Sequence, residues 1–164
     1  MPRQPATFRI DPGSEFSRVA AALREIDEDL PGQLRDELRD AVKPLVREAQ
    51  RKAQQIPAHG RAHTGLRTRV AKGVRAHVFV GRKPGVEIVS TMPDKSERNL
   101  PAYLDNPGAG WRHPVFGNRH EWVSQHTGAP WFRETFAQGD DDIEGRLDYV
   151  MNRAAETIAA AGRG

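Results

Sequence analysis

WRHPVFGNRHEWVSQ at residues 111–125, followed by PWF at 130–132, is the stretch around which the rest of the chain is organised. The two pieces hold all three tryptophans and two of the six phenylalanines of the 164-residue chain. Aromatic rings at this density, set among Gly, Pro and His, form either a small core beneath a loop or a contact surface, because Trp and Phe dominate the energetics of both. We interpret the stretch as both.

The aromatic residues of this stretch differ in their local patterns. Trp122 alternates with Glu121 and Val123 as in a half-buried strand, which predicts packing on the core. The Trp131-Phe132 pair is expected to plug the sheet beneath the last helix. Gly117 followed by Asn118 favours a reversal of the chain, since both residue types tolerate positive φ.

Two helices are predicted ahead of the sheet, in residues 14–56. Apolar side chains recur every three or four residues between Phe16 and Leu30, and again along a second helix that follows Asp29 and ends near Gln55. Pro44 lies inside the second helix and is expected to bend it. Residues 1–13, rich in Pro, are predicted to form an N-terminal arm or an edge strand.

The region from residue 64 to residue 132 is predicted to hold a small antiparallel sheet and the aromatic loops. Residues 77–80 and 85–90 are rich in β-branched side chains and are separated by hairpin-turn residues. Residues 66–74 are strand-like but broken by Gly73, and residues 100–105 suit a short helical turn or a strand. The fold class is therefore α+β in one domain, with a C-terminal helix over residues 140–160 packed on the sheet.

Charge is divided along the chain. Residues 1–42 carry 6 basic and 9 acidic side chains, residues 43–132 carry 15 and 6, and residues 133–164 carry 4 and 7. Plain solvation accounts for most single surface charges. Two sharper alternatives remain: the basic middle faces nucleic acid, or oppositely charged faces of neighbouring subunits meet in a ring.

Catalytic patterns are weak. His113, Asn118 and His120 spell the letters of a His-Asn-His nuclease but lie within eight positions, whereas such sites draw on separate elements. His59 and His63 have metal-ligand spacing only on a helix, and the nearby Pro and Gly argue against one. We expect no enzyme activity, cofactor or metal. No apolar run approaches the roughly 20 residues of a membrane span, so we expect no membrane partner and synthesis in the cytoplasm.

A family resemblance rests on residues 111–132. The Trp-Arg-His-Pro-Val-Phe-Gly run, a Trp-Val after it, and Pro-Trp-Phe before a final helix resemble the neck or tail-completion proteins of long-tailed phages, the group of the lambda tail-completion protein. Thr64-Gly65-Leu66-Arg67 is similar to a turn that leads into the sheet in these proteins.

The resemblance implies a structural virion protein of the phage neck. Such a subunit forms a ring, expected to be six-fold, between the head-closure and tail-terminator rings, with DNA passing through the lumen without sequence specificity. The alternative is a free nucleic-acid-binding protein. The residues expected at the subunit or ring interface are Trp111, Arg112, His113, Phe116, Trp131 and Phe132, some of which anchor the fold instead. The residues expected to face the lumen or an acidic partner are Arg67, Arg69, Lys72, Arg75, Arg82 and Lys83.

Overall fold

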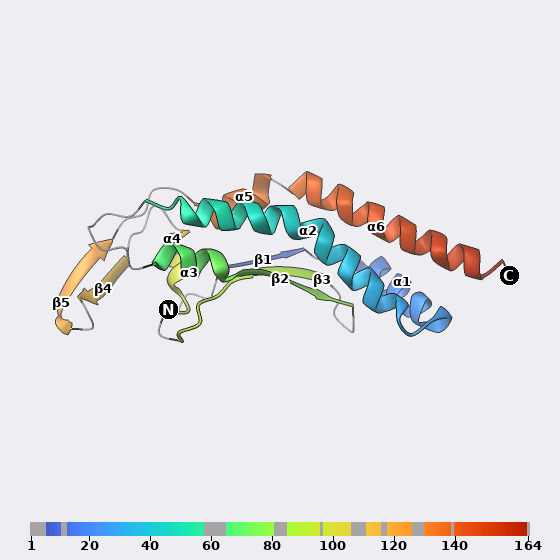
Figure 1. Cartoon of the computed structure of the whole chain (residues 1–164), viewed down its shortest axis with the longest axis horizontal. Helices are drawn as coiled ribbons and strands as arrows, with labels where there is room; N and C mark the ends of the chain where they lie inside the picture. Colours follow the sequence, from blue (N-terminus) through green and yellow to red (C-terminus); the bar gives the residue numbers. More distant parts are fainter. Residues whose placement is uncertain are drawn as a thin grey trace.

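The computed structural model describes residues 6–10, 13–57, 65–80, 85–95, 97–105, 111–115, 118–125, 130–138 and 140–163. Within these ranges the side chains of residues 10, 13–15, 111, 113–115, 118–119, 125 and 140–144 are outside the description. The molecule is elongated, with the C-terminus and a helical end on one side and a separate β-hairpin on the other (Figure 1).

The fold is α+β, as the sequence predicts. In chain order the elements are β1 (Ala6–Ile10), α1 (Gly13–Ile26), α2 (Leu30–Gln54), α3 (Leu66–Lys72), β2 (Val74–Phe79), β3 (Gly85–Ser90), α4 (Leu100–Leu104), β4 (Trp111–Val115), β5 (Asn118–Gln125), α5 (Phe132–Gln138) and α6 (Asp140–Ala161). None of the described helices is long and apolar enough to cross a membrane.

Helix α2 is the longest element of the fold. Its 25 residues span about 38 Å at 1.5 Å per residue. The predicted apolar stripe is confirmed, since Leu34, Leu38, Val42, Ala49 and Ala53 are all buried. Pro44 lies inside the helix, and α2 changes direction along its length (Figure 1), as expected where a proline removes a backbone hydrogen bond. The helix therefore curves along the core with its charged side in solvent.

The prediction of a strand in residues 66–74 is wrong for its larger part, which forms α3. Gly65 takes the left-handed conformation with φ of 67°, and its carbonyl accepts a hydrogen bond from the Arg69 N–H at 3.0 Å. Val70 and Ala71 are buried against α2. Leu66 lies one turn before Val70, so the helical period places these two side chains on one face, with Ala71 next to Val70 at its edge.

A three-stranded antiparallel sheet has the order β1-β3-β2. Residues 6–10 thus form an edge strand, one of the two alternatives predicted for residues 1–13, and residues 1–5 and 11–12 lie outside the described residues. In the central strand, Val86, Ile88 and Ser90 alternate onto the face that meets the helices and are almost completely buried. Gly73 ends α3 and lies against the backbone of Thr91, the residue that follows β3. A Cβ built on Gly73 would lie 2.0 Å from the Thr91 carbonyl oxygen.

Helices cover one face of this sheet. Helix α2 contacts β2 and β3, and α5 contacts β1 (Figure 1). The C-terminal helix α6 runs in the opposite direction to α2 and, among the described residues, makes its main contacts with α1, α2 and α5. Its buried side chains Leu147, Val150 and Ala154 recur every three or four residues and lie on one face. The sheet is thus covered by α2 and α5, and α6, which we expected on the sheet, packs instead on α1 and α2 as a further helical layer.

An aromatic cluster joins α5 to the sheet. The Phe136 ring stacks on Phe8 of β1 at 5.1 Å, and it meets the Phe132 ring edge-on at 4.8 Å. Trp131 packs against Phe132 at 5.3 Å. Trp131 and Phe132 are 3% and 0% exposed, so the expected burial of this pair is confirmed. The pair lies at the start of α5, and it is the Phe136 ring of this helix that meets the sheet at Phe8.

A buried carboxylate fixes the start of α5. Asp105, directly after α4, is buried, and its Oδ1 accepts hydrogen bonds from the backbone N–H groups of Phe132 at 2.6 Å and Arg133 at 3.2 Å. The Arg133 Nε also donates to Asp105 Oδ2 at 3.0 Å. Since the first N–H groups of a helix have no partner within it, the carboxylate supplies one from a point 27 residues earlier in the chain.

We predict that Asp105→Ala lowers the free energy of unfolding by about 2–3 kcal/mol, because buried N–H groups lose their acceptor and the helix loses its cap. Asp105→Asn, which keeps one acceptor oxygen, should cost less. Asp148→Ala on the exposed side of α6 is the matched control and should stay within about 0.5 kcal/mol of the wild type. Urea denaturation of the three variants measures this, and equal losses for Asp105→Ala and Asp148→Ala would contradict it.

Candidate assembly interface

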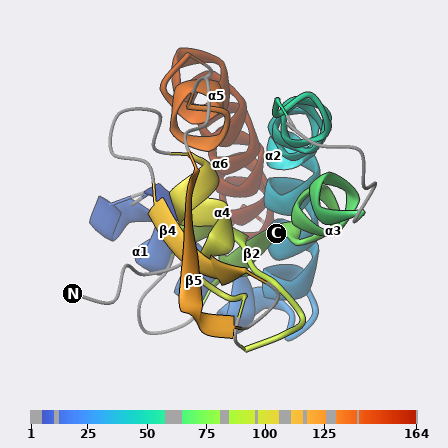
Figure 2. The same ribbon diagram turned by 90° about the vertical axis from the view of Figure 1, so that its left-hand side faces the viewer.

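Strands β4 and β5 form a two-stranded antiparallel hairpin, which we call the arm (residues 111–125). Trp111 pairs with Gln125, and Pro114 pairs with Trp122. The register shifts between Pro114 and Val115, where proline cannot donate to the ladder. The arm pairs with no other described strand and stands at one end of the molecule (Figures 1 and 2).

The described side chains of the arm are exposed on both of its faces. Five consecutive residues of β5, from His120 to Ser124, are all exposed, although successive strand side chains point to opposite faces. Trp122 is 48% and Val123 is 41% exposed. A lone two-stranded hairpin is marginally stable in water unless a face packs on something. Burial of the arm's exposed side chains against another surface would therefore stabilise this hairpin.

The prediction that Trp122 packs on the core is wrong. The alternation of Glu121, Trp122 and Val123 correctly indicates a strand, but this strand joins a separate hairpin in place of the main sheet. The Arg112 guanidinium carbon lies 5.9 Å from the centroid of the Trp122 ring, within the range of a cation–π contact. The ring thus packs within the arm against a cation and keeps half of its surface open.

The six residues predicted at the subunit interface divide into two groups. Trp131 and Phe132 are buried in the core of the single chain, the fold-anchoring alternative, so another copy cannot cover them. Trp111, Arg112 and His113 lie in β4. The Arg112 side chain is exposed, while Phe116 and the side chains of Trp111 and His113 are outside the described residues. The candidate interface therefore centres on the arm.

The predicted basic cluster is also divided. The Arg67 Nη1 donates to the carbonyl oxygens of Gln54 at 3.4 Å and Ile56 at 3.3 Å, where it satisfies acceptors at the C-terminal end of α2. The Arg69 guanidinium binds both carboxylate oxygens of Glu97, at 2.9 and 3.1 Å. These two arginines hold α3 to its neighbours and are only partly available for another partner.

The rest of the basic cluster lies nearer the surface. Lys72 and Arg75 are exposed, and Arg82 and Lys83 are outside the described residues.

On α2 the Arg51 guanidinium donates to the Glu48 carboxylate at 2.8 Å, which lowers the pKa of Glu48 and raises that of Arg51. Both of these side chains lie on the solvent side of the helix, so the pair adds little to stability.

Sequence reasoning missed a second exposed surface, the face of the three-stranded sheet away from the helices, which we call the open sheet face. The register aligns Arg9 of β1, Glu87 of β3 and His77 of β2 in one row across the sheet. Arg75 lies in the next row on the same face, and Arg9, Arg75 and His77 are exposed. Strand alternation predicts which side chains of each single strand share a face. Only the β1–β3 pairing shows that Arg9 lies beside Glu87 and His77.

The described side chains show no arrangement suited to catalysis by a metal. No group of three or more His, Cys, Asp or Glu among them could hold a metal ion. His59 and His63 fall outside the described residues, and His120 is exposed on the arm. No family model, curated protein or solved structure matches the chain.

We predict opposite effects for two aromatic truncations. Trp122→Ala should leave the free energy of unfolding within about 0.5 kcal/mol of the wild type, because the ring lies outside the core. Phe132→Ala should lower it by about 3–5 kcal/mol, because the ring is fully buried. Thermal and urea denaturation measure both variants. A large loss of stability in Trp122→Ala would mean that the arm packs on the body of the molecule.

Proposed function

We propose that the chain is a structural subunit of the phage neck, acting in tail completion and head-to-tail joining as part of an oligomeric ring around the DNA channel. The observation that carries an assembly role is the arm, whose described side chains, Arg112 and residues 120–124, are all exposed. The assignment to the phage neck comes from the resemblance of residues 111–132. In this proposal the partners are further copies of the chain, expected to form a six-fold ring, and the head-closure and tail-terminator rings above and below it.

The elongated shape supports this proposal. The arm projects from one end, so it can reach a neighbour without disturbing the core (Figure 1). Exposed aromatic surface of this kind is typical of protein–protein contacts. A subunit that buries its exposed aromatic side chains against a neighbour requires no reacting groups. We propose that this chain has no enzymatic function and acts in the virion.

The open sheet face is the candidate surface for the DNA lumen or an acidic neighbour. Arg9 and Arg75 are exposed on it, together with His77. Guanidinium groups on an extended surface attract phosphates without reading bases, and this attraction weakens as salt rises. Glu87 lies in the same row as Arg9 and His77, which moderates the positive charge and suits passage of DNA better than tight binding.

The alternative, a free nucleic-acid-binding protein, is favoured by one observation. Arg112 and the half-exposed Trp122 ring lie together on the arm, and a ring beside a cation can stack a base and hold a phosphate. Such a protein should bind DNA as a single chain, whereas a neck subunit depends on assembly.

Ring formation separates the two functions. We expect sedimentation velocity to show concentration-dependent self-association, and negative-stain images of concentrated protein to show closed rings. In a gel-shift assay the protein should bind double-stranded DNA weakly, and this binding should disappear with added salt. Trp122→Ala should reduce ring formation without loss of folding. A chain that stays single at every soluble concentration, shifts DNA strongly and loses that binding on Trp122→Ala would establish the alternative.

A further inference from the structure

The end of the molecule opposite the arm carries a compact group of acidic residues. The turn between α1 and α2, which we call the acidic turn (residues 25–29), reads Glu25-Ile26-Asp27-Glu28-Asp29, and every one of these side chains is exposed. Asp27 Oδ1 accepts a hydrogen bond from the Asp29 N–H at 2.8 Å, which gives the turn a defined shape. Ile26 is 41% exposed, so an apolar side chain lies open among four carboxylates.

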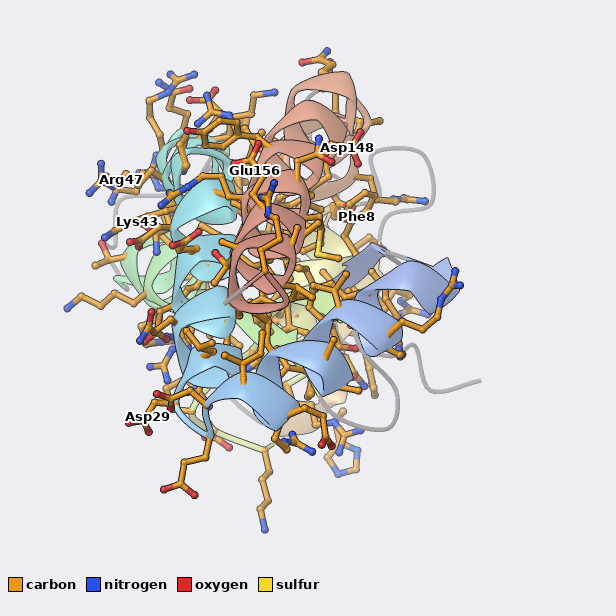
Figure 3. All side chains as sticks on the ribbon, turned by 90° about the vertical axis from the view of Figure 1, so that its right-hand side faces the viewer. Phe8, Asp29, Lys43, Arg47, Asp148 and Glu156 are labelled. Atoms are coloured by element: carbon orange, nitrogen blue, oxygen red, sulfur yellow. The ribbon has the colours of Figure 1, made fainter. Side chains whose placement is uncertain are left out.

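The arm and the acidic turn face away from each other. Figure 1 shows the hairpin at one end of the long axis and the α1–α2 turn near the other, and Figure 2 views the molecule from the arm. Figure 3 views it from the opposite end, with Asp29 labelled at the turn. Surfaces at opposite ends of the long axis do not meet within the chain, but they can meet between chains.

One face of the arm is complementary to the acidic turn. Arg112 pairs with Ser124, and Pro114 pairs with Trp122, so strand alternation puts Arg112, Trp122 and Ser124 on the same face. Glu121 and Val123 alternate onto the other face. The described side chains of the first face therefore offer a cation, a half-exposed ring, a hydroxyl and the His120 imidazole, with no carboxylate among them.

We propose that the arm of one copy docks on the acidic turn of the next copy, with Trp122 covering Ile26 and Arg112 facing Asp27 and Glu28. This inference rests on the proposed ring and names the surfaces that join it. The contact is head-to-tail, so each subunit uses one arm and one turn, and such contacts close into a ring when the rotation between copies permits. Burying the Trp122 ring and the exposed part of Ile26 supplies the apolar centre of the contact, and the charged pairs set its orientation.

A second copy fits this face of the arm better than a nucleic acid does. A nucleic acid would account for Arg112 and Trp122 on the arm. It would leave Ile26 exposed, and its phosphates could not pair with the four carboxylates of the acidic turn. A second copy covers both surfaces at once and joins opposite charges. The same division appears in the sequence, where the residues of the arm belong to the basic middle and the acidic turn belongs to the acidic first part.

Engineered cysteines test the contact directly, because the chain has none of its own. Ser124→Cys places a thiol beside Trp122 on the docking face, and Glu28→Cys places one on the acidic turn. Under mild oxidation the double variant should form a ladder of disulfide-linked oligomers, and a mixture of the two single variants should form linked dimers. Each single variant alone should give at least tenfold less linked product, since a head-to-tail contact brings unlike ends together.

A matched control fixes the position of the contact. The pair Ser124→Cys with Asp148→Cys keeps the arm thiol and moves its partner to an exposed residue of α6, away from the turn. This pair should give no ladder. Efficient linking of Ser124→Cys with itself would show that like arms meet and would overturn the proposal, as would equal yields from the Glu28 and Asp148 pairs.

Charge reversal tests the same contact in solution. Arg112→Glu should weaken self-association about tenfold or more, and the Asp27→Arg, Glu28→Arg double variant should do the same. Mixing the two should restore oligomers larger than a dimer, because the reversed arm meets the reversed turn at one joint and the unchanged arm meets the unchanged turn at the next. A mixture that stops at dimers would contradict the pairing, since the unchanged arm and turn alone can join only two chains.

Failure of this inference and failure of the proposed function are distinguishable. Rings that survive both charge reversals, with no ladder from the Glu28 pair, would overturn the docking and leave the ring function standing. Absence of rings in the wild type would overturn both. Loss of DNA binding in Arg112→Glu, from a chain that never self-associates, would overturn the docking in favour of a nucleic acid as the partner of the arm.

Discussion

The carboxylate of Asp105 joins the end of α4 to the start of α5, the two parts of the core between which the arm lies in the sequence. It is buried at the end of α4 and accepts hydrogen bonds from the first N–H groups of α5, so the chain leaves the body and returns to it at nearly the same point. The arm lies between Asp105 and Phe132 in the sequence. Because the base is fixed by a buried charged group with several partners, the aromatic segment can project without loosening the helices and sheet. The whole arrangement of core, arm and opposite end depends on this attachment.

The attachment also divides the aromatic residues by role. Trp131 and Phe132 follow the arm directly and are buried with Phe136 against the sheet, while Trp122 within the arm keeps about half of its surface open. The same sequence stretch therefore supplies a core plug and an exposed surface. The acidic turn lies at the other end of the rigid body formed by α1, α2 and α6 (Figures 1 and 3), so the chain has two unlike ends and a stable middle.

The sequence predicts the elements whose pattern is local. The stripe along α2 and the β2–β3 hairpin follow from apolar spacing and turn residues, and both are confirmed. Residues 66–72 look like a strand because Leu, Thr and Val are interspersed with Arg, but burial of Val70 and Ala71 against α2 requires a helix. The fate of Trp122 could not be predicted, because alternation indicates a strand without saying which sheet it joins. Likewise Arg67 and Arg69 are indistinguishable in sequence from free surface cations until their partners, an α2 terminus and Glu97, are placed in space.

The central claim is that the arm is exposed in the single chain and covered on assembly. Amide hydrogen exchange, followed by mass spectrometry on peptides from residues 111–125, measures this most directly. In dilute protein these amides should exchange much faster than those of α2. In concentrated, assembled protein their exchange should slow while that of α2 stays the same. Slow exchange of the arm in dilute protein, or fast exchange that persists in the assembly, would contradict the account.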